Sequence, residues 1–214
     1  KNEQTDTWFK GLDRVYNNFV YDYLYPNPAS VLAFIENHDT DRFLGEGENL
    51  DMLKQASTLL LTTRRIPQLY YGTEVMMNGV KSKSDGYVRK DFPGGWADDK
   101  ENALTPEGRT RLQNESYNFY RNLLNWRKGN DVIAKGSMKQ FMVQHGVYAY
   151  ARQYKGKTVF VLLNGTDKEV KLPLKYYAEV LKDKTQGKDV ISGKVTALNE
   201  ELTMAPRQSM VIEL

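Results

Sequence analysis

The sequence predicts an α/β region followed by a small all-β domain. Over residues 1–130, helix-like apolar stripes alternate with short, continuous apolar runs. After Gly129, alternating apolar residues and tight turns replace the helical patterns. Hydrophobic residues make up 40% of the 214-residue chain, which is enough to bury a substantial core. We therefore predict two domains, at residues 1–130 and 131–214.

The first predicted element is an amphipathic helix with apolar residues at spacings of four, three and four. Thr5 or Thr7 is a suitable N-cap for this helix. Pro26 and Pro28 stop it decisively. Its apolar stripe consists of Trp8, Leu12, Val15 and Phe19.

Two short apolar runs, Val31–Ile35 and Ile66–Gly72, are predicted to be strands. Each run is continuous, which is typical of strands covered on both faces, as in a parallel sheet. Pro67 fits only at the start of its strand. A helix is predicted between the runs, at Leu50–Arg64, with one apolar face formed by Leu53, Ala56 and Leu60.

A long irregular stretch follows, at Met76–Asn102, and loops of this length in a compact domain are usually functional or disordered. Thr105 and Pro106 are then predicted to cap a long helix, with proline at its first position. The order of helix, strand, helix, strand, loop and helix is a βα repeat whose strands end at two polar loops. The buried face of the last helix is predicted to include Leu112, Phe119, Leu123 and Trp126.

The C-terminal domain is predicted to be antiparallel from about Met138 onward. Two alternating runs flank Lys155-Gly156, which is a hairpin signal. Asn164-Gly-Thr166 is interpreted as another hairpin turn, although it also fits the N-glycosylation pattern. The predicted strands are Val147–Arg152, Thr158–Leu163, Tyr177–Leu181 and Gln208–Ile212.

Composition argues against several kinds of partner and binding site. The chain has 30 basic and 27 acidic residues and no dense basic run, so we expect no nucleic-acid partner. No span approaches the ~20 apolar residues that cross a membrane, so we expect no membrane insertion. Cysteine is absent, and His38 and His145 lie far apart in sequence, so we expect no metal site and no cofactor in this chain. The acidic residues at 98, 99 and 101 are interpreted as a solvated loop and not as a calcium site.

The strongest functional signal is a polar cluster directly after the first apolar run. Catalytic groups of parallel barrels lie at the C-terminal ends of the strands. A carboxylate there can stabilise an oxocarbenium-like transition state, and a neighbouring imidazole can hold sugar hydroxyls. The alternative is a turn and helix-capping cluster, and spacing alone does not choose between the two. The cluster consists of Glu36, Asn37, His38, Asp39, Asp41 and Arg42.

Three segments resemble motifs of the α-amylase superfamily of glycoside hydrolases. Residues 33–43, Ala-Phe-Ile-Glu-Asn-His-Asp-Thr-Asp-Arg-Phe, resemble its fourth conserved region, and residues 66–74, Ile-Pro-Gln-Leu-Tyr-Tyr-Gly-Thr-Glu, resemble the motif at its eighth barrel strand. Residues 89–96, Arg-Lys-Asp-Phe-Pro-Gly-Gly-Trp, look like the following loop in neopullulanases and cyclomaltodextrinases of the bacterial starch-utilisation type. One departure is Arg65, where the family commonly has glycine. The resemblance covers nearly the whole chain. It implies the last two βα units of a TIM (β/α)8 barrel followed by a small antiparallel β-sandwich.

The resemblance also implies residue roles. Asp39 matches the third catalytic carboxylate, which binds and distorts the sugar at the cleavage point and stabilises the transition state. His38 matches the histidine that hydrogen-bonds hydroxyls of the same sugar. Asn37 matches the motif's asparagine, a substrate-site residue that is expected to position its neighbours.

Two further residues are candidate substrate contacts. Arg42 has either a glycan or structural contact, or an ion pair with Asp41 or Glu46. Trp96 is a candidate to stack on a sugar ring from the long loop. Arg89 is expected to tie that loop down through an ion pair.

The family's retaining mechanism needs two further groups, a nucleophilic Asp on the fourth strand and an acid/base Glu on the fifth. We expect both to precede this chain, because the resemblance begins near the seventh strand. The parent protein is thus expected to hydrolyse α-1,4 bonds, with α-1,6 bonds as a second candidate. Its substrates are expected among starch, maltooligosaccharides, pullulan and cyclodextrins, and the isolated chain is expected to be inactive. The alternatives are a non-catalytic glycan-binding or accessory protein on the same scaffold, and a purely structural β module.

The resemblance carries three further expectations. Calcium is compatible with the full-length enzyme, in parts of the barrel outside this chain. Two strands of an eight-stranded barrel leave bare edges, so we expect the truncated barrel to self-associate. The chain itself does not encode its compartment, and the branch suggests a periplasmic or extracellular bacterial protein.

Overall fold

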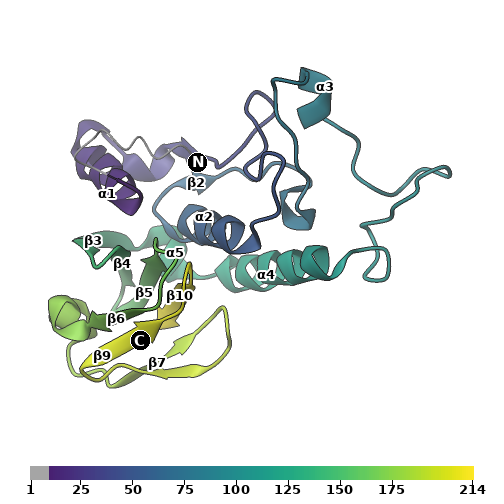
Figure 1. Cartoon of the computed structure of the whole chain (residues 1–214). Coiled ribbons are helices and arrows are strands. Elements are labelled where there is room, and N and C mark those ends of the chain that lie inside the picture. The colour runs from purple at the N-terminus through teal and green to yellow at the C-terminus, as the bar shows by residue number, and fades with distance from the viewer. Residues whose placement is uncertain (1–9) are drawn as a thin grey trace. The chain divides into compact units, whose positions relative to one another are not determined.

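The computed structural model describes residues 10–214, whose contacts form two compact units. Unit 1 contains residues 10–31, 62–65 and 126–214, and unit 2 contains residues 32–61 and 66–125. Figure 1 shows the elements of both units along the chain. The predicted N-caps and Trp8 of the first helix lie outside the described residues. The contact units do not follow the predicted sequence boundary at residue 130, which stays a prediction.

Unit 1 is built on a six-stranded antiparallel sheet and a separate two-stranded ribbon, as the sequence predicts for its C-terminal part. The sheet order is β3-β4-β5-β10-β7-β8, and the ribbon is β6-β9. The sheet strands are β3 (Ser137–Gln144), β4 (Val147–Tyr154), β5 (Lys157–Asn164), β7 (Gln186–Asp189), β8 (Val195–Ala197) and β10 (Ser209–Glu213). The ribbon strands are β6 (Val170–Pro173) and β9 (Glu201–Met204). The helical elements are α1 (Leu12–Val20), η1 (Tyr21–Leu24), η2 (Pro28–Ser30), α5 (Asp131–Lys135), η4 (Leu174–Tyr177) and α6 (Ala178–Leu181).

The core of unit 1 lies between the six-stranded sheet and the β6-β9 ribbon. Alternate residues of β4 point into it, because side chains along a strand alternate between faces. The intervening Tyr148 and Tyr150 are also fully buried, and the ring of Tyr148 lies 6.4 Å from that of Tyr16 on α1. Both faces of β4 are therefore covered, which explains why its first five residues are all apolar or aromatic. Core residues include Val147, Ala149, Ala151, Phe160, Leu162, Leu172, Leu202, Met204, Met210 and Ile212.

Two-residue turns close the β3-β4 and β4-β5 hairpins of this sheet. Lys155 (φ 47°) and Gly156 (φ 77°) both adopt left-handed backbone conformations between β4 and β5, and this confirms the predicted hairpin. His145 (φ 53°) and Gly146 (φ 78°) do the same between β3 and β4. Positive φ at both positions matches the twist of the flanking strands.

The predicted strand at Tyr177–Leu181 is wrong. These residues end η4 and form α6. The buried side chains are Tyr177, Val180 and Leu181, which are spaced three and one apart and so share one helical face. A run of this length cannot be assigned to helix or strand from periodicity alone.

Unit 2 contains one parallel strand pair and two long helices. Its elements are β1 (Leu32–Ala33), α2 (Leu50–Thr62), β2 (Ile66–Pro67), η3 (Thr73–Val75), α3 (Asp85–Val88) and α4 (Arg111–Arg127), although the last residues of α2 and α4 belong to unit 1. Leu53 and Leu60 lie on the buried face of α2, as predicted. The hydroxyls of Ser57 and Tyr120 join α2 to α4. None of the helices in residues 10–214 is long and apolar enough to span a membrane.

The two predicted strands of unit 2 run parallel, as expected, but they are shorter and more exposed than predicted. Leu32 pairs with Ile66 in a parallel register. Each strand has only two residues, and Leu32, Phe34 and Ile66 are 53%, 43% and 48% exposed. The described sheet has two strands, so neighbouring strands do not cover these side chains.

The long helix of unit 2 begins later than predicted. Thr105 does not cap it, because its hydroxyl accepts a hydrogen bond from Gly108 within a turn. The helix starts at Arg111, where Thr110 and Gln113 form a reciprocal capping box. Each side chain of that pair accepts the other's backbone N–H, as in the Ser/Thr-x-x-Gln signature.

Candidate active site

The polar cluster after β1 forms a turn shaped by Asn37. The side-chain oxygen of Asn37 accepts the backbone N–H of Asp39 at 2.8 Å, and the backbone N–H of Asn37 donates to the Thr40 hydroxyl at 3.0 Å. Asparagine commonly makes such a turn by bonding its own backbone two residues on. The turn presents His38 and Asp39 side by side, with side chains 58% and 61% exposed.

His38 and Asp39 contact each other and a third residue from the long loop. His38 Nε2 lies 3.2 Å from Asp39 Oδ2. Arg89 Nη2 donates to Asp39 Oδ1 at 3.1 Å, and Arg89 Nε donates to the His38 carbonyl at 2.9 Å. Each oxygen of the Asp39 carboxylate therefore has a nitrogen partner, and the carboxylate has a defined direction.

Arg89 directly follows the short helix α3. The Ser84 hydroxyl accepts the Tyr87 N–H and so caps this helix. Asp85 Oδ2 accepts a second hydrogen bond from Arg89 Nη2 at 3.1 Å, and Lys81 Nζ lies 3.3 Å from Asp85 Oδ1. The expected ion pair of Arg89 is confirmed. Asp85 did not come from the sequence analysis, although its i,i+4 spacing to Arg89 on a helix would have indicated it.

Arg42 is in the interior of unit 2 and not on a surface that faces a ligand. Its side chain is 0% exposed, and its donors reach the Val88 carbonyl at 3.0 Å, the Tyr71 carbonyl at 2.6 Å and Glu36 at 3.3 Å. Its guanidinium also lies 4.0 Å from the centre of the Tyr70 ring, within cation–π distance. These contacts correct the expected ion pair with Asp41 or Glu46, because the buried partner is Glu36. They assign Arg42 a structural contact and give no support to a direct glycan contact.

Glu36 is the matching buried anion. Its side chain is 2% exposed and accepts hydrogen bonds from the backbone of Phe43, the hydroxyl of Thr73 and the guanidinium of Arg42. Burying a carboxyl group is costly unless hydrogen-bond donors surround it, and these three donors supply the partners that Glu36 needs. Glu36 therefore fixes the turn that follows β1 against the segment that follows β2.

Backbone hydrogen bonds join the same two segments further along. Arg42 N–H donates to Gly79 O at 2.9 Å, and Gly79 N–H donates to Gly45 O at 2.7 Å. The backbone of Lys81 donates to the Asp41 carboxylate at 2.7 Å. Residues 36–47 and 79–89 are thus bound to each other along their lengths.

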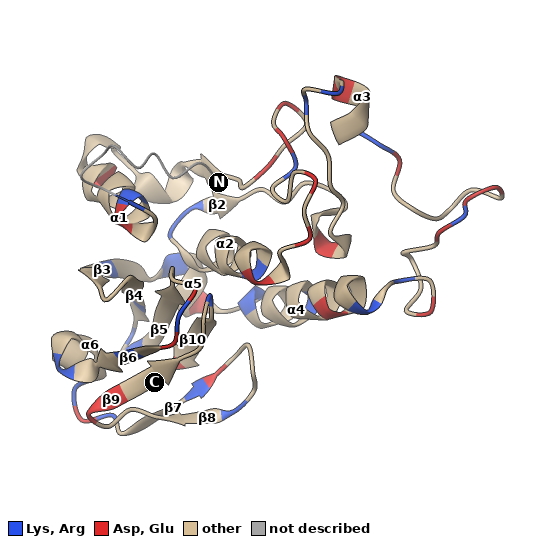
Figure 2. Ribbon diagram, viewed as in Figure 1, with Lys and Arg blue, Asp and Glu red and all other residues tan. Residues whose placement is uncertain are grey.

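Two residues after β2 have perturbed acidity. Burial raises the pKa of the half-buried Glu74 carboxyl above its usual value of 4.5. Burial also raises the pKa of the Tyr71 phenol, whose hydroxyl donates to the Lys90 carbonyl at 2.5 Å. Figure 2 shows acidic and basic residues interspersed along the loops between β2 and α4, so these loops do not form a patch of one sign.

A cavity of about 670 Å³ lies between the long loop and the start of α4. Its lining combines thioethers with charged groups and includes Met76, Met77, Lys90, Asp91, Glu101 and Arg111. His38 and Asp39 are not among its lining residues. In the part of the chain that the structure describes, no group of three or more acidic or histidine side chains is placed to hold a metal ion.

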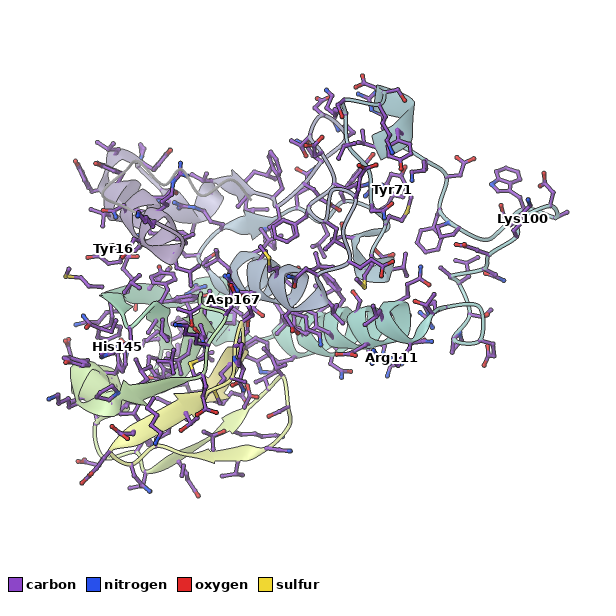
Figure 3. All side chains as sticks on the ribbon, viewed as in Figure 1. Tyr16, Tyr71, Lys100, Arg111, His145 and Asp167 are labelled. Carbon is purple, nitrogen blue, oxygen red and sulfur yellow. The ribbon has the colours of Figure 1, made fainter. Side chains whose placement is uncertain are left out.

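Trp96 lies on the outer part of the long loop. Its side chain is 69% exposed, and its backbone N–H donates to Asp99 Oδ2 at 2.9 Å. Figure 3 shows Lys100 at the end of a loop that projects away from the region of unit 2 around Tyr71. The structure does not bring Trp96 together with His38 and Asp39, so its stacking role stays a prediction.

The chain is similar to several known proteins. Residues 138–213 match the family described as "Cyclo-malto-dextrinase C-terminal domain". An α-amylase from Niallia circulans is 29% identical over 203 residues, which are 91% of this chain and 34% of that protein. A cyclomaltodextrin glucanotransferase from Thermoanaerobacterium thermosulfurigenes is 32% identical over 162 residues, 76% of this chain and 20% of that protein.

The chain is thus similar in sequence to α-amylases and cyclomaltodextrin glucanotransferases. It spans about a third or less of the length of these curated relatives. Among solved structures, CldA, a cyclomaltodextrin glucanotransferase described as having a three-domain ABC distribution, is 25% identical with a TM-score of 0.71, over 95% of this chain and 40% of that one. The α-amylase from Geobacillus thermoleovorans, complexed with acarbose, is 20% identical with a TM-score of 0.72, over 95% of this chain and 43% of that one. The β-rich C-terminal part of the chain thus matches a C-terminal domain family and has the antiparallel sheets that the sequence predicts.

Proposed function

We propose that this chain is part of an α-glucan-cleaving enzyme in which β1 and β2 are the last two strands of a (β/α)8 barrel. The parallel pairing of Leu32 with Ile66 fits such a barrel. The exposed Leu32, Phe34 and Ile66 are apolar side chains that further strands and helices would cover. In this proposal the barrel part ends near residue 130, and residues 131–214 are the β domain that follows it.

The proposed reaction is retaining cleavage of α-1,4 glucosidic bonds, with α-1,6 bonds as a second candidate. The observation that carries it is the His38–Asp39 pair, which lies in the turn after the parallel strand β1, in the sequence context Phe34-Ile-Glu-Asn-His-Asp39. The curated relatives are named α-amylase and cyclomaltodextrin glucanotransferase, and these names support an α-glucan substrate. We propose starch, maltooligosaccharides, pullulan and cyclodextrins as the substrates to test.

The chemistry assigned to the pair follows from its geometry. Asp39 is an exposed carboxylate whose direction is fixed by His38 and Arg89, so it can accept hydrogen bonds from hydroxyls of a bound sugar. Such bonds strengthen as positive charge develops on the sugar ring, which lowers the barrier. His38 lies beside Asp39 and can hold a hydroxyl of the same sugar.

We further propose that the isolated chain does not cleave glycans. Retaining cleavage requires a nucleophile and an acid/base group, and Asp39 acts as neither in this proposal. Glu36 is unsuited to either role because its carboxylate is buried and already bonded to Arg42 and Thr73. The parent protein would supply both groups. The resemblance of residues 89–96 to neopullulanases supports that branch as the parent.

The decisive experiment uses the full-length protein encoded by the parent reading frame. Its release of reducing sugar from starch, pullulan and β-cyclodextrin is measured for wild type, Asp39→Asn and Asp98→Asn. Asp98 is an exposed acid of the long loop and serves as the matched control. We expect Asp39→Asn to lower kcat by about 10²–10³-fold and Asp98→Asn to leave it unchanged. Equal rates for wild type and Asp39→Asn would refute the role of Asp39.

Three further measurements complete the test. Proton NMR of the anomeric products reports whether configuration is retained, and inversion would refute the proposed mechanism. Binding of maltooligosaccharides without cleavage by the full-length protein would favour a non-catalytic glycan-binding protein instead. Light scattering of the 214-residue chain tests self-association, and a mass of one 24.7 kDa chain would count against it.

A further inference from the structure

We propose that Arg89 is a positioning residue that holds Asp39 in its working direction. This inference rests on the proposed function and adds a role for a residue outside the matched His-Asp motif. Arg89 lies 50 positions after Asp39 in the sequence. The structure nevertheless places its guanidinium against both members of the pair.

The contact is a fork and not a single bond. Arg89 Nε donates to the His38 carbonyl at 2.9 Å, and Nη2 donates to Asp39 Oδ1 at 3.1 Å. The bond from Nε fixes the peptide group between His38 and Asp39, and the bond from Nη2 fixes the side-chain carboxylate of Asp39. Because the guanidinium is planar and rigid, it holds the peptide group and the carboxylate in a fixed relative orientation. A lysine ammonium acts as a point charge and cannot do this.

Arg89 is itself held in place from two sides. Asp85, one helical turn earlier on α3, accepts from the same Nη2 at 3.1 Å. Val88, the preceding residue, has a fully buried side chain, and its carbonyl accepts from the buried Arg42 at 3.0 Å. The backbone of Arg89 is therefore anchored to the interior of unit 2, although its side chain is 39% exposed.

Exposed ion pairs usually contribute little to stability, so this contact is not proposed as a stabilising one. Its consequence is geometric. A carboxylate has about four acceptor positions on its two oxygens. Arg89 and His38 occupy one position on each oxygen of Asp39, and the others stay open to sugar hydroxyls. Without Arg89, the carboxylate can rotate away from a reacting ring, and a displacement of about 1 Å in such a group can lower a rate about a hundredfold.

The test uses the full-length enzyme with Arg89→Met, Arg89→Lys and the control Lys83→Met. Lys83 lies in the same loop and pairs with Glu46, so its removal breaks an exposed ion pair without touching His38 or Asp39. We expect Arg89→Met to lower kcat by roughly 10- to 100-fold with KM changed less than about threefold. Arg89→Lys should recover part of kcat, because it restores the charge but not the fork. Lys83→Met should match wild type.

Each other outcome overturns the inference. Unchanged kcat in Arg89→Met removes any positioning role. A raised KM with unchanged kcat would make Arg89 a substrate-binding residue instead. Equal losses of kcat and of folded fraction by circular dichroism, with no recovery in Arg89→Lys, would make its role merely structural. A wild-type enzyme with no activity on any α-glucan would refute the proposed function itself, and that result is separate from these three.

Discussion

Replacement of Arg152 by methionine is expected to destabilise unit 1 strongly. Arg152 lies on β4 and is 1% exposed. Its guanidinium donates to the carbonyls of Thr62, Ile133 and Gly136 at 2.8 Å each, and to Ser137 O at 3.3 Å. These carbonyls lie at or next to the C-terminal ends of α2 and α5, where helices leave carbonyls without intrahelical donors. Arg152 therefore serves as a shared cap for two helix ends.

The size of the effect follows from the hydrogen bonds lost. Hydrogen bonds to charged groups contribute about 1.5–3 kcal/mol each, so the three short bonds represent roughly 5–9 kcal/mol. Burial lowers the pKa of Arg152 to about 10, which shows that its charge is poorly solvated. Relief of that buried charge offsets part of the loss, and we expect a net loss of about 3 kcal/mol. For a chain of this size, Tm should fall by about 6–12 °C.

The assay is thermal unfolding of the 214-residue chain by scanning calorimetry. Arg152→Lys should be intermediate, because an ammonium has three donors but cannot span all four carbonyls. Lys171→Met, an exposed position on β6, is the matched control and should stay within about 0.5 kcal/mol of wild type. A Tm for Arg152→Met within 2 °C, roughly, of wild type would refute the capping argument.

Three further predictions concern single groups. Burial raises the pKa of Tyr177 to about 12, and among the described residues its hydroxyl has no hydrogen-bond partner. Tyr177→Phe should therefore leave the free energy of unfolding in urea unchanged or raise it by up to about 1 kcal/mol. A clear loss of stability would contradict this. Burial raises the folded-state pKa of Glu74 above 4.5, so its ionisation lowers the stability of the fold as pH rises through that folded pKa. Glu74→Gln should therefore raise Tm at pH 7 but not below pH 4.5. An equal change of Tm at the two pH values would count against this explanation. Lys155→Asn should stabilise the hairpin by roughly 0.5 kcal/mol, because asparagine tolerates the left-handed conformation before Gly156; a lower denaturation midpoint would oppose this.

Local patterns in the sequence predicted α1, β4, β5 and β10 of unit 1. The alternation in β4 and β5 and the Lys155-Gly156 turn depend on neighbouring residues only, so they could be predicted without knowledge of tertiary contacts. Tyr177–Leu181 could not, because a five-residue segment with four apolar residues fits a strand and a helical turn equally well. The start of α4 has two candidate signals in the sequence, the Thr110–Gln113 capping box and Thr105-Pro106. The structure uses the capping box.

The candidate site was only partly predictable for a different reason. The His38–Asp39 pair is a local sequence feature in the turn that follows β1. The partners of Arg42 and Arg89 come from residues up to 51 positions away, and periodicity carries no information on such pairs. Arg42 has a structural role because it is buried. Its position near two acidic residues in the sequence does not reveal that it packs on Tyr70.

The hydrogen bonds that join residues 36–47 to 79–89 set where the long loop can be altered. A deletion or insertion before Arg89 would shift Gly79, Lys81 and Val88 against their partners and so disturb the turn that carries Asp39. Residues 97–101 are exposed, and length changes there would leave those partners in register. Chimeras that exchange this loop between relatives should therefore be joined after residue 91, and libraries aimed at new glucan specificity should vary the outer half of the loop first.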